Sequence, residues 1–185
     1  AQKFNNDFKT DIFPIPAPLI LGAATKVMSL RDGLKKMSKS DPSGYSRIML
    51  SDNEDEIIKK IKKAKTDPES LPENLEEAKK RPEALNLLTI YAALNDIKLD
   101  KAISDYAGKE FSIFKKDLGE IASSKLSPVS LEMNKLMQDK QYLDSIINRG
   151  KERAIEVAEP VLSKVYEIVG FFKGWYPKFF IFLHQ

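Results

Sequence analysis

Residues 36–42, which read Lys-Met-Ser-Lys-Ser-Asp-Pro, carry the side chains best suited to chemistry. Lys36 and Lys39 place two ammonium groups three residues apart, and each is a compact positive charge with three hydrogen-bond donors. Ser38, Ser40 and the backbone amides of the loop can add hydrogen bonds to phosphate oxygens. The residue types and their spacing predict a loop that binds the phosphates of a nucleotide. The alternative is a solvated surface loop, because Lys and Ser are common on protein surfaces.

The sequence Lys-Met-Ser-Lys-Ser at residues 36–40 resembles the signature loop (KMSKS) of class I aminoacyl-tRNA synthetases. The surrounding sequence narrows the resemblance to bacterial-type tryptophanyl-tRNA synthetases, since the related tyrosine enzymes usually carry Phe-Gly in place of Met37 and Ser38. The similarity extends from residue 1 to about residue 170. The blocks that carry it are residues 26–30, 36–42, 57–67, 87–94, 108–118 and 126–128.

The resemblance implies an aminoacyl-tRNA ligase of protein biosynthesis that joins tryptophan to its tRNA. Its substrates and cofactors would be ATP with Mg²⁺, L-tryptophan and tRNA(Trp), and the intact family forms homodimers. The implied catalytic side chains are Lys36 and Lys39. The implied nucleotide-binding set is Val27, Lys36, Met37, Ser38, Lys39 and Ser40. In these roles Lys39 meets the departing pyrophosphate with support from Lys36 and Ser38, and backbone groups of Val27 and Met37 hold the adenine.

The sequence contains no counterpart of the family's N-terminal nucleotide fold, whose Gly-rich turn completes the ATP site. Residues 1–4 resemble the middle of a family helix. We therefore expect the C-terminal portion of such an enzyme, inactive without the missing N-terminal half. Two alternatives are a catalytically silent tRNA-binding helical module formed by residues 82–169, and a decayed gene product with no stable function.

The composition excludes several kinds of site. The chain has no Cys, which removes disulfides, thiolate nucleophiles and Cys-ligated zinc, and its single His, His184, cannot form a multi-His metal site. We expect no metal held by protein ligands. Lys and Arg number 30 against 27 Asp and Glu, and this net charge of +3 is too small to indicate nucleic-acid binding by itself. No signal peptide is visible and no apolar run approaches the roughly 20 residues of a spanning helix, so we expect a cytoplasmic protein without a membrane partner.

The loop needs neighbouring elements that hold it in place. Residues 27–30 predict a short strand, and their lack of alternation favours a strand buried on both faces of a parallel sheet, with neighbours from the missing half. Turn signals lie on either side of the loop, at residues 31–33 and 41–44. Ser51 as N-cap with Glu54 three residues later predicts a capping box, followed by a helix that ends near residue 65.

That helix carries the densest positive charge in the chain. The lysines are Lys59, Lys60, Lys62, Lys63 and Lys65. Ile57, Ile61 and Ala64 are expected to form its buried face. The lysines could be a solvated surface that counters the helix dipole, or they could contact tRNA phosphates, in which case binding would depend on salt. The sequence leaves both interpretations open.

The fold is predicted to be mainly α: the C-terminal part of a class I Rossmann-type catalytic domain, with the strand and the signature loop, followed by an α-helical bundle. The predicted domains are residues 1–66 for the catalytic part, 67–81 for a connector, 82–170 for a helical domain, and 171–185 for an atypical aromatic tail. The resemblance implies that the helical domain binds the anticodon.

Within the helical domain, the apolar stripes are expected to be buried against one another, including a last helix over residues 142–169. A kink or break is expected at Pro128. The candidate phosphate contacts are Lys115, Lys116, Lys135, Arg149 and Arg153, and the alternative for each is a solvated side chain. The aromatic tail has three interpretations: a frameshifted or read-through end, a segment that packs over the bundle, or a membrane-surface anchor.

Overall fold

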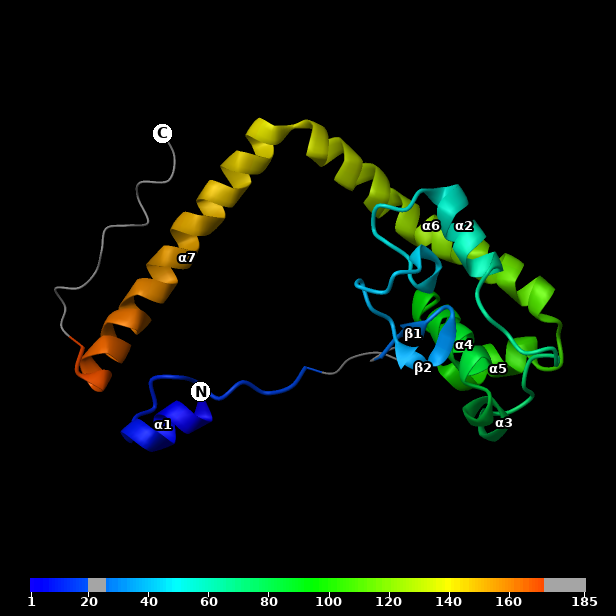
Figure 1. Cartoon of the computed structure of the whole chain (residues 1–185), viewed down its shortest axis with the longest axis horizontal. Helices are drawn as coiled ribbons and strands as arrows, with labels where there is room; N and C mark the ends of the chain where they lie inside the picture. The colour runs from blue at the N-terminus through cyan, green and yellow to red at the C-terminus, as the bar shows by residue number, and fades with distance from the viewer. Residues whose placement is uncertain (20–25, 172–185) are drawn as a thin grey trace. The chain divides into compact units, whose positions relative to one another are not determined.

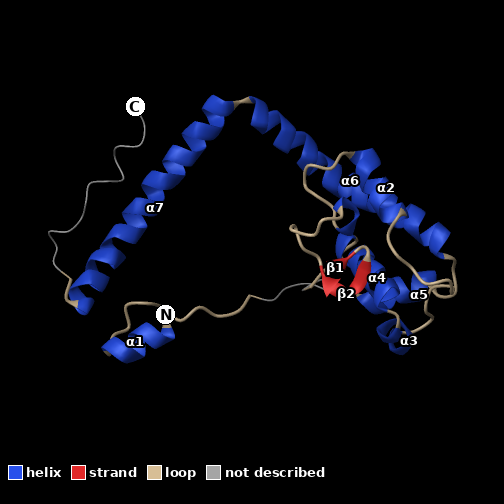
Figure 2. Ribbon diagram, viewed as in Figure 1, coloured by secondary structure: helices blue, strands red, loops and turns tan. Residues whose placement is uncertain are grey.

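The computed structural model describes residues 1–19 and 26–171, and most of these residues are helical (Figures 1 and 2). The predicted mainly α fold is confirmed. The elements in chain order are α1 (Gln2–Phe8), β1 (Met28–Ser29), β2 (Asp32–Lys36), the 3₁₀ helix η1 (Gly44–Ser46), α2 (Glu54–Lys62), α3 (Leu75–Lys80), α4 (Pro82–Leu94), α5 (Leu99–Tyr106), α6 (Phe111–Gln138) and α7 (Lys140–Val169). Within the two described ranges, no helix combines the length and the apolarity that crossing a membrane requires.

The chain divides into two compact units. One is formed by Ile20–Gln138, and the other by Ala1–Leu19 together with Asp139–Gln185. The hydrophobic core of the described residues lies in the first unit, which also contains the signature loop. The domain boundaries expected after residues 66, 81 and 170 remain a prediction.

The core of the first unit forms between α2, α4, α5 and α6, and α2 lies alongside α6 (Figure 1). Its buried side chains recur three or four residues apart on these helices, as amphipathic packing requires. They include Ile57, Ile61, Ala64, Leu87, Leu88, Phe114 and Leu118. The two helices are in van der Waals contact at Gly119, where a Cβ would lie 3.8 Å from the Cα of Ile58. Helix α6 runs through Pro128 to Gln138, so the helix does not break at this proline.

The strand predicted at residues 27–30 is present in part as β1, but it has a different partner from the one expected. It pairs with β2 in an antiparallel two-stranded sheet, with Met28 opposite Lys36. The side-chain amide of Asn86, in α4, also binds the strand: Met28 N donates to Asn86 Oδ1 at 3.0 Å, and Asn86 Nδ2 donates to Met28 O at 3.0 Å. The prediction of a parallel strand with partners from outside the chain is therefore wrong, because β2 and Asn86 bind its backbone.

Strand β2 lies against the start of α4, and Gly33 is buried at this contact. A Cβ at Gly33 would lie 2.5 Å from Pro82 C and 2.6 Å from Glu83 N. Both are backbone atoms that cannot turn aside, so only glycine fits. This close approach fixes the hairpin, and with it the loop that follows, on the helical core.

In the second unit, α7 confirms the last helix expected over residues 142–169 and contains Pro160 in its interior. The expectation that its apolar stripe is buried is wrong for this chain: no residue of α7 is buried, and Val157 is 69% exposed. The periodicity of the sequence identifies the helix correctly. The buried residues of the core, however, all lie between Leu30 and Ala122, outside α7. Beyond residue 171, the predicted aromatic tail lies outside the described residues.

Candidate nucleotide-binding loop and adjacent basic face

The hairpin leads directly into the signature loop of residues 36–40. Lys36 is the last residue of β2, and Met37 N donates to Val27 O at 3.0 Å, which extends the strand pairing by one residue. The side chain of Met37 packs against the core. The exposed members of the predicted site are Lys36, Ser38, Lys39 and Ser40. The structure thus places Val27 and Met37 side by side through their backbones, with the polar residues in solvent next to them.

Two serines organise the tip of the loop. Ser38 Oγ and Ser40 Oγ share a hydrogen bond of 2.9 Å, and Ser40 N donates to Ser38 Oγ at 3.3 Å. Asp41 closes the turn, because its carboxylate accepts a hydrogen bond from Ser43 N at 2.8 Å. The result is two exposed ammonium groups beside a pair of hydroxyls, a donor set that suits phosphate oxygens.

Arg47 also contacts this loop, and sequence reasoning did not single it out. Its Nη1 donates to Asp41 O at 2.8 Å. Three longer contacts, of 3.4 to 3.5 Å, reach Ser43 O, Ser46 Oγ and Ser38 O. On its other side, Arg47 Nε faces Met49 Sδ at 3.4 Å. No helical or strand periodicity relates these partners, so no sequence pattern could have revealed the contacts.

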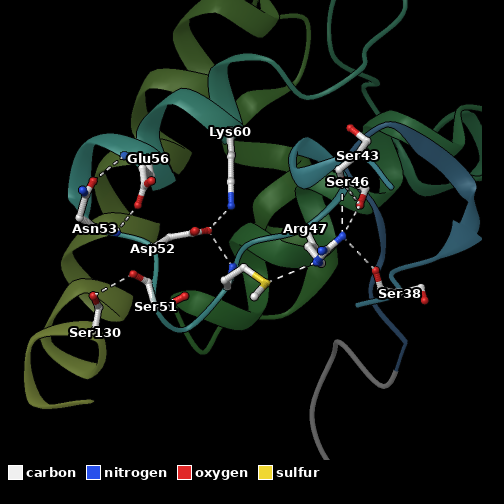
Figure 3. Close-up of polar contacts among 11 residues, drawn as sticks. Ser38, Ser43, Ser46, Arg47, Ser51, Asp52, Asn53, Glu56, Lys60 and Ser130 are labelled. Carbon is white, nitrogen blue, oxygen red and sulfur yellow. Dashed lines mark hydrogen bonds and ion pairs between the residues drawn. The ribbon is translucent and has the colours of Figure 1, made fainter. Parts of the chain in front are cut away.

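Helix α2 begins with a capping box, but two residues later than predicted. Asn53 is the N-cap: its Oδ1 accepts a hydrogen bond from Glu56 N at 2.9 Å, and Glu56 Oε2 accepts one from Asn53 N at 3.0 Å (Figure 3). The predicted box of Ser51 and Glu54 is therefore wrong, although the type of cap is right.

The reason for the shift lies in Asp52, which forms a buried ion pair with Lys60 of α2; their side chains are 9% and 13% exposed. The same carboxylate accepts a hydrogen bond from Met49 N at 2.7 Å. Because these contacts fix residue 52, the helix starts after it and the N-cap moves from Ser51 to Asn53. The pair also removes Lys60 from the lysines that a ligand could reach.

Three of the five lysines form what we call the basic face of α2: Lys59, Lys62 and Lys63. Lys65 is excluded along with Lys60, because it pairs with Glu83 at 2.9 Å. The three lysines of the basic face are exposed. The positive charge of Lys59 is the main cause of a lowered pKa at the neighbouring Tyr45 hydroxyl. A hydrogen bond from Lys63 and the charge of Lys63 lower the pKa of this hydroxyl further.

A cavity of about 670 Å³ lies beside the basic face, between α2 and the start of α6. Its lining combines apolar, hydroxyl and charged groups: Ile58, Phe111, Thr66, Ser112, Lys62, Lys115, Lys116 and the carboxylate of Glu120. Lys115 Nζ donates to Ala64 O at 2.7 Å, and burial lowers the pKa of this ammonium. The ammonium of Lys115 therefore interacts with the carboxyl end of α2, where the helix dipole favours a cation. Lys116 is exposed and keeps its place among the candidate phosphate contacts.

The sequence matches known proteins over most of its length. The family model described as tRNA synthetases class I (W and Y) matches residues 1–124. A curated tryptophan–tRNA ligase of Caulobacter vibrioides is 52% identical over 172 residues, covering 92% of this chain and 50% of the relative. One from Rickettsia felis is 46% identical over 171 residues, covering 92% and 51%. The chain therefore spans about half the length of the curated relatives it matches.

Solved structures with similar folds are also of this kind. Tryptophanyl-tRNA synthetase from Mycoplasma pneumoniae superposes with a TM-score of 0.68 at 23% identity, covering 94% of this chain and 53% of that one. The enzyme from Campylobacter jejuni, complexed with ADP and tryptophan, superposes with a TM-score of 0.60 at 24% identity, covering 92% and 51%. At this level of identity the likeness shows the fold.

Proposed function

The chain belongs to the class I tRNA synthetases of the tryptophan and tyrosine type, and we propose that it carries the loop with which a tryptophan–tRNA ligase activates tryptophan with ATP. The observation that carries the proposal is the geometry of the signature loop, which presents two exposed ammonium groups beside a serine pair on a hairpin fixed to the core. The names of the curated relatives support tryptophan and tRNA as substrates, and the ADP and tryptophan bound in the Campylobacter jejuni structure support an adenine nucleotide and tryptophan as ligands.

In the proposed reaction the tryptophan carboxylate attacks the α-phosphorus of ATP, and the bond to the bridging oxygen breaks as pyrophosphate leaves. Negative charge develops on the pyrophosphate during this step. A cation that meets those oxygens mainly in the transition state lowers the barrier, whereas equal binding of substrate and transition state does not. We assign this role to Lys39, with Lys36 and Ser38 in support. The tryptophanyl group then passes to the terminal ribose of tRNA(Trp).

The remaining parts of the proposal concern the nucleotide and the partners. Val27 N–H and Met37 C=O are assigned to the adenine, because Val27 O and Met37 N already bond to each other. Ser40 would add a hydroxyl for the phosphates, and Mg²⁺ bound with ATP would supply further positive charge there, held by the nucleotide and not by a cage of protein ligands. A homodimer in the cytoplasm, with an N-terminal half that completes the site, is the proposed working form.

We predict that the purified 185-residue chain alone does not catalyse tryptophan-dependent exchange of pyrophosphate into ATP, because it spans about half of the relatives named for this activity. Exchange is expected when the chain is mixed with the half of the Caulobacter vibrioides relative that it does not match. We call this mixture the reassembled enzyme. The measurement is incorporation of labelled pyrophosphate into ATP, after co-purification has shown that the two pieces associate.

Two outcomes contradict this prediction. Exchange by the chain alone, free of host enzyme, would show that no second half is needed. A co-purified pair without exchange would contradict the ligase proposal, and tRNA binding that persisted in that pair would favour the catalytically silent tRNA-binding module.

We also propose that the basic face binds tRNA through phosphates. Changing Lys59, Lys62 and Lys63 together to Glu is expected to reduce the slope of log affinity against log salt by about 0.7 to 0.9 for each phosphate that is no longer neutralised. Preference among tRNA species should stay the same, because phosphates carry no base information. The helix should survive, since Ile57 and Ile61 on its buried face are untouched. Filter binding across a salt series, with tRNA(Trp) and one unrelated tRNA, measures both quantities.

The matched control changes Lys79, Lys80 and Lys98 to Glu, which alters net charge equally at three exposed lysines away from α2. If both triple variants shift the slope by the same amount, the effect is one of net charge and the basic face is only a solvated helix surface.

A further inference from the structure

The segment that contains the signature loop has few anchors of its own between residues 38 and 46. Its described backbone N–H groups bond locally, within three residues along the chain. These bonds are Ser40 N to Ser38 Oγ, Asp41 N to Ser38 O, Ser43 N to Asp41 Oδ1, and Ser46 N to Ser43 O. Local turns of this kind bend the chain, but they do not fix its direction relative to the core. Longer-range contacts must do so. At the end of the segment, Lys63 Nζ lies 4.7 Å from the centre of the Tyr45 ring, and at the tip the contacts come from Arg47.

Arg47 extends from a fixed piece of backbone directly after this segment. Ser46 is 1% exposed, and its carbonyl accepts a hydrogen bond from Leu30 N at 2.9 Å. Ile48 packs against the core, and Met49 N is bound by the buried ion pair at the start of α2. The residues on both sides of Arg47 are therefore held in place, and its side chain has a rigid base.

From that base, the side chain reaches back across the loop (Figure 3). Arg47 Nη1 donates to Asp41 O at 2.8 Å and approaches Ser43 O at 3.4 Å and Ser38 O at 3.5 Å, partners that lie six, four and nine residues earlier. A guanidinium can serve several carbonyl oxygens from one planar group, which a lysine ammonium on a flexible stem does less well. These are the contacts that tie the tip of the loop to its base.

We propose that Arg47 is the positioning residue of the signature loop. By holding the backbone at residues 38, 41 and 43, it sets where Lys39 stands relative to the rest of the nucleotide site. Arg47 acts through the backbone and not on the substrate. The inference rests on the proposed function, because the position of Lys39 affects catalysis only if the loop meets the leaving pyrophosphate.

The first test uses the 185-residue chain itself and two variants, Arg47→Gln, which removes the charge, and Arg47→Lys, which keeps the charge but removes the planar group. The amides of Ser40, Ser43 and Ser46 are expected to exchange with deuterium about 10- to 100-fold faster in both, the factor expected when a charge-assisted hydrogen bond is removed. The amides of α2 and α4 should keep their exchange rates, which separates a loosened loop from an unfolded chain.

Arg31→Gln is the matched control. It removes the same charge and one hydrogen bond, from Arg31 Nη1 to Lys63 O at 2.9 Å, outside the loop. The loop amides should exchange at the original rate in this variant. Unchanged exchange of the loop amides in Arg47→Gln overturns the proposal, and so does an equal increase in Arg31→Gln.

The second test measures the reaction in the reassembled enzyme. Arg47→Gln is expected to lower kcat for pyrophosphate exchange about 10- to 100-fold, as misplacement of a reacting group does, and to leave the KM for tryptophan unchanged. If the loop amides exchange faster in Arg47→Gln but kcat is unchanged, the positioning role is overturned. If the unmodified reassembled enzyme shows no exchange, it is the proposed function that fails, and deuterium exchange alone then decides whether Arg47 fixes the loop.

Discussion

Replacing Lys39 by Ala is expected to lower the rate of tryptophan activation in the reassembled enzyme by about 10²- to 10³-fold, the range for removal of one group that stabilises developing charge. Lys39 is exposed and lies between Ser38 and Ser40 in the chain, and among the described residues its ammonium has no hydrogen bond or ion pair. The KM for tryptophan should change little, because the loop acts on the leaving group and not on the amino acid. Pyrophosphate exchange measured across a range of tryptophan concentrations gives both constants.

Lys35→Ala is the control for this variant. Lys35 lies in β2, four residues before Lys39, and its side chain is 79% exposed and forms only a 3.5 Å pair with Asp32. Its removal therefore takes the same charge from the strand that leads into the loop. A weak exposed pair contributes little to stability, and the rate should stay within about twofold. If Lys39→Ala raised only the KM for tryptophan, the loop would bind substrate uniformly and the assigned role would be wrong.

Replacing Gly33 by Ala is expected to destabilise the fold by about 2 to 3 kcal/mol. Adding atoms to a tightly packed contact costs about 1 to 3 kcal/mol, and the upper part of this range applies where backbone must move. The added Cβ would lie 2.5 Å from Pro82 C and 2.7 Å from Pro82 O. To relieve this overlap, β2 must separate from α4, and the signature loop moves with it. Thermal unfolding followed by circular dichroism should show a Tm lower by about 5 to 10 °C.

Gly44→Ala provides the comparison, because a Cβ at Gly44 has no atom within 4 Å outside its own neighbours. Its stability should stay within about 0.5 kcal/mol of the unmodified chain, as is usual for open surface positions. Equal Tm values for the two alanine variants would mean that the hairpin does not rest on α4 as the structure has it.

The signature loop could be predicted from the sequence because its chemistry is contained in five consecutive residues. The buried face of α2 was equally accessible, since Ile57, Ile61 and Ala64 follow the helical period. Such features depend on neighbours within one helical turn or one loop, and the amino-acid order shows them directly.

The features that the sequence did not show depend on partners far along the chain. Met28 is bound by Asn86, which lies 58 residues away, and this contact replaces the expected parallel neighbour. Five lysines lie between residues 59 and 65 and look equivalent in the sequence. The structure, however, pairs Lys60 with Asp52 and Lys65 with Glu83. In α7 the periodicity marks an apolar face, but it does not say whether anything in this chain covers that face.

The contact between Asn86 and β1 also protects the edge of the small sheet. Val27 O accepts a hydrogen bond from Met37 N, so the backbone groups of Val27 face β2. Because direction alternates from one residue of a strand to the next, the N–H and C=O of Met28 point away from β2. Those are the groups that a strand from another molecule would bind, and open edges of this kind template aggregation. The amide of Asn86 occupies both at 3.0 Å. One side chain thus takes the place of a third strand and denies this edge to strand addition by a neighbouring molecule.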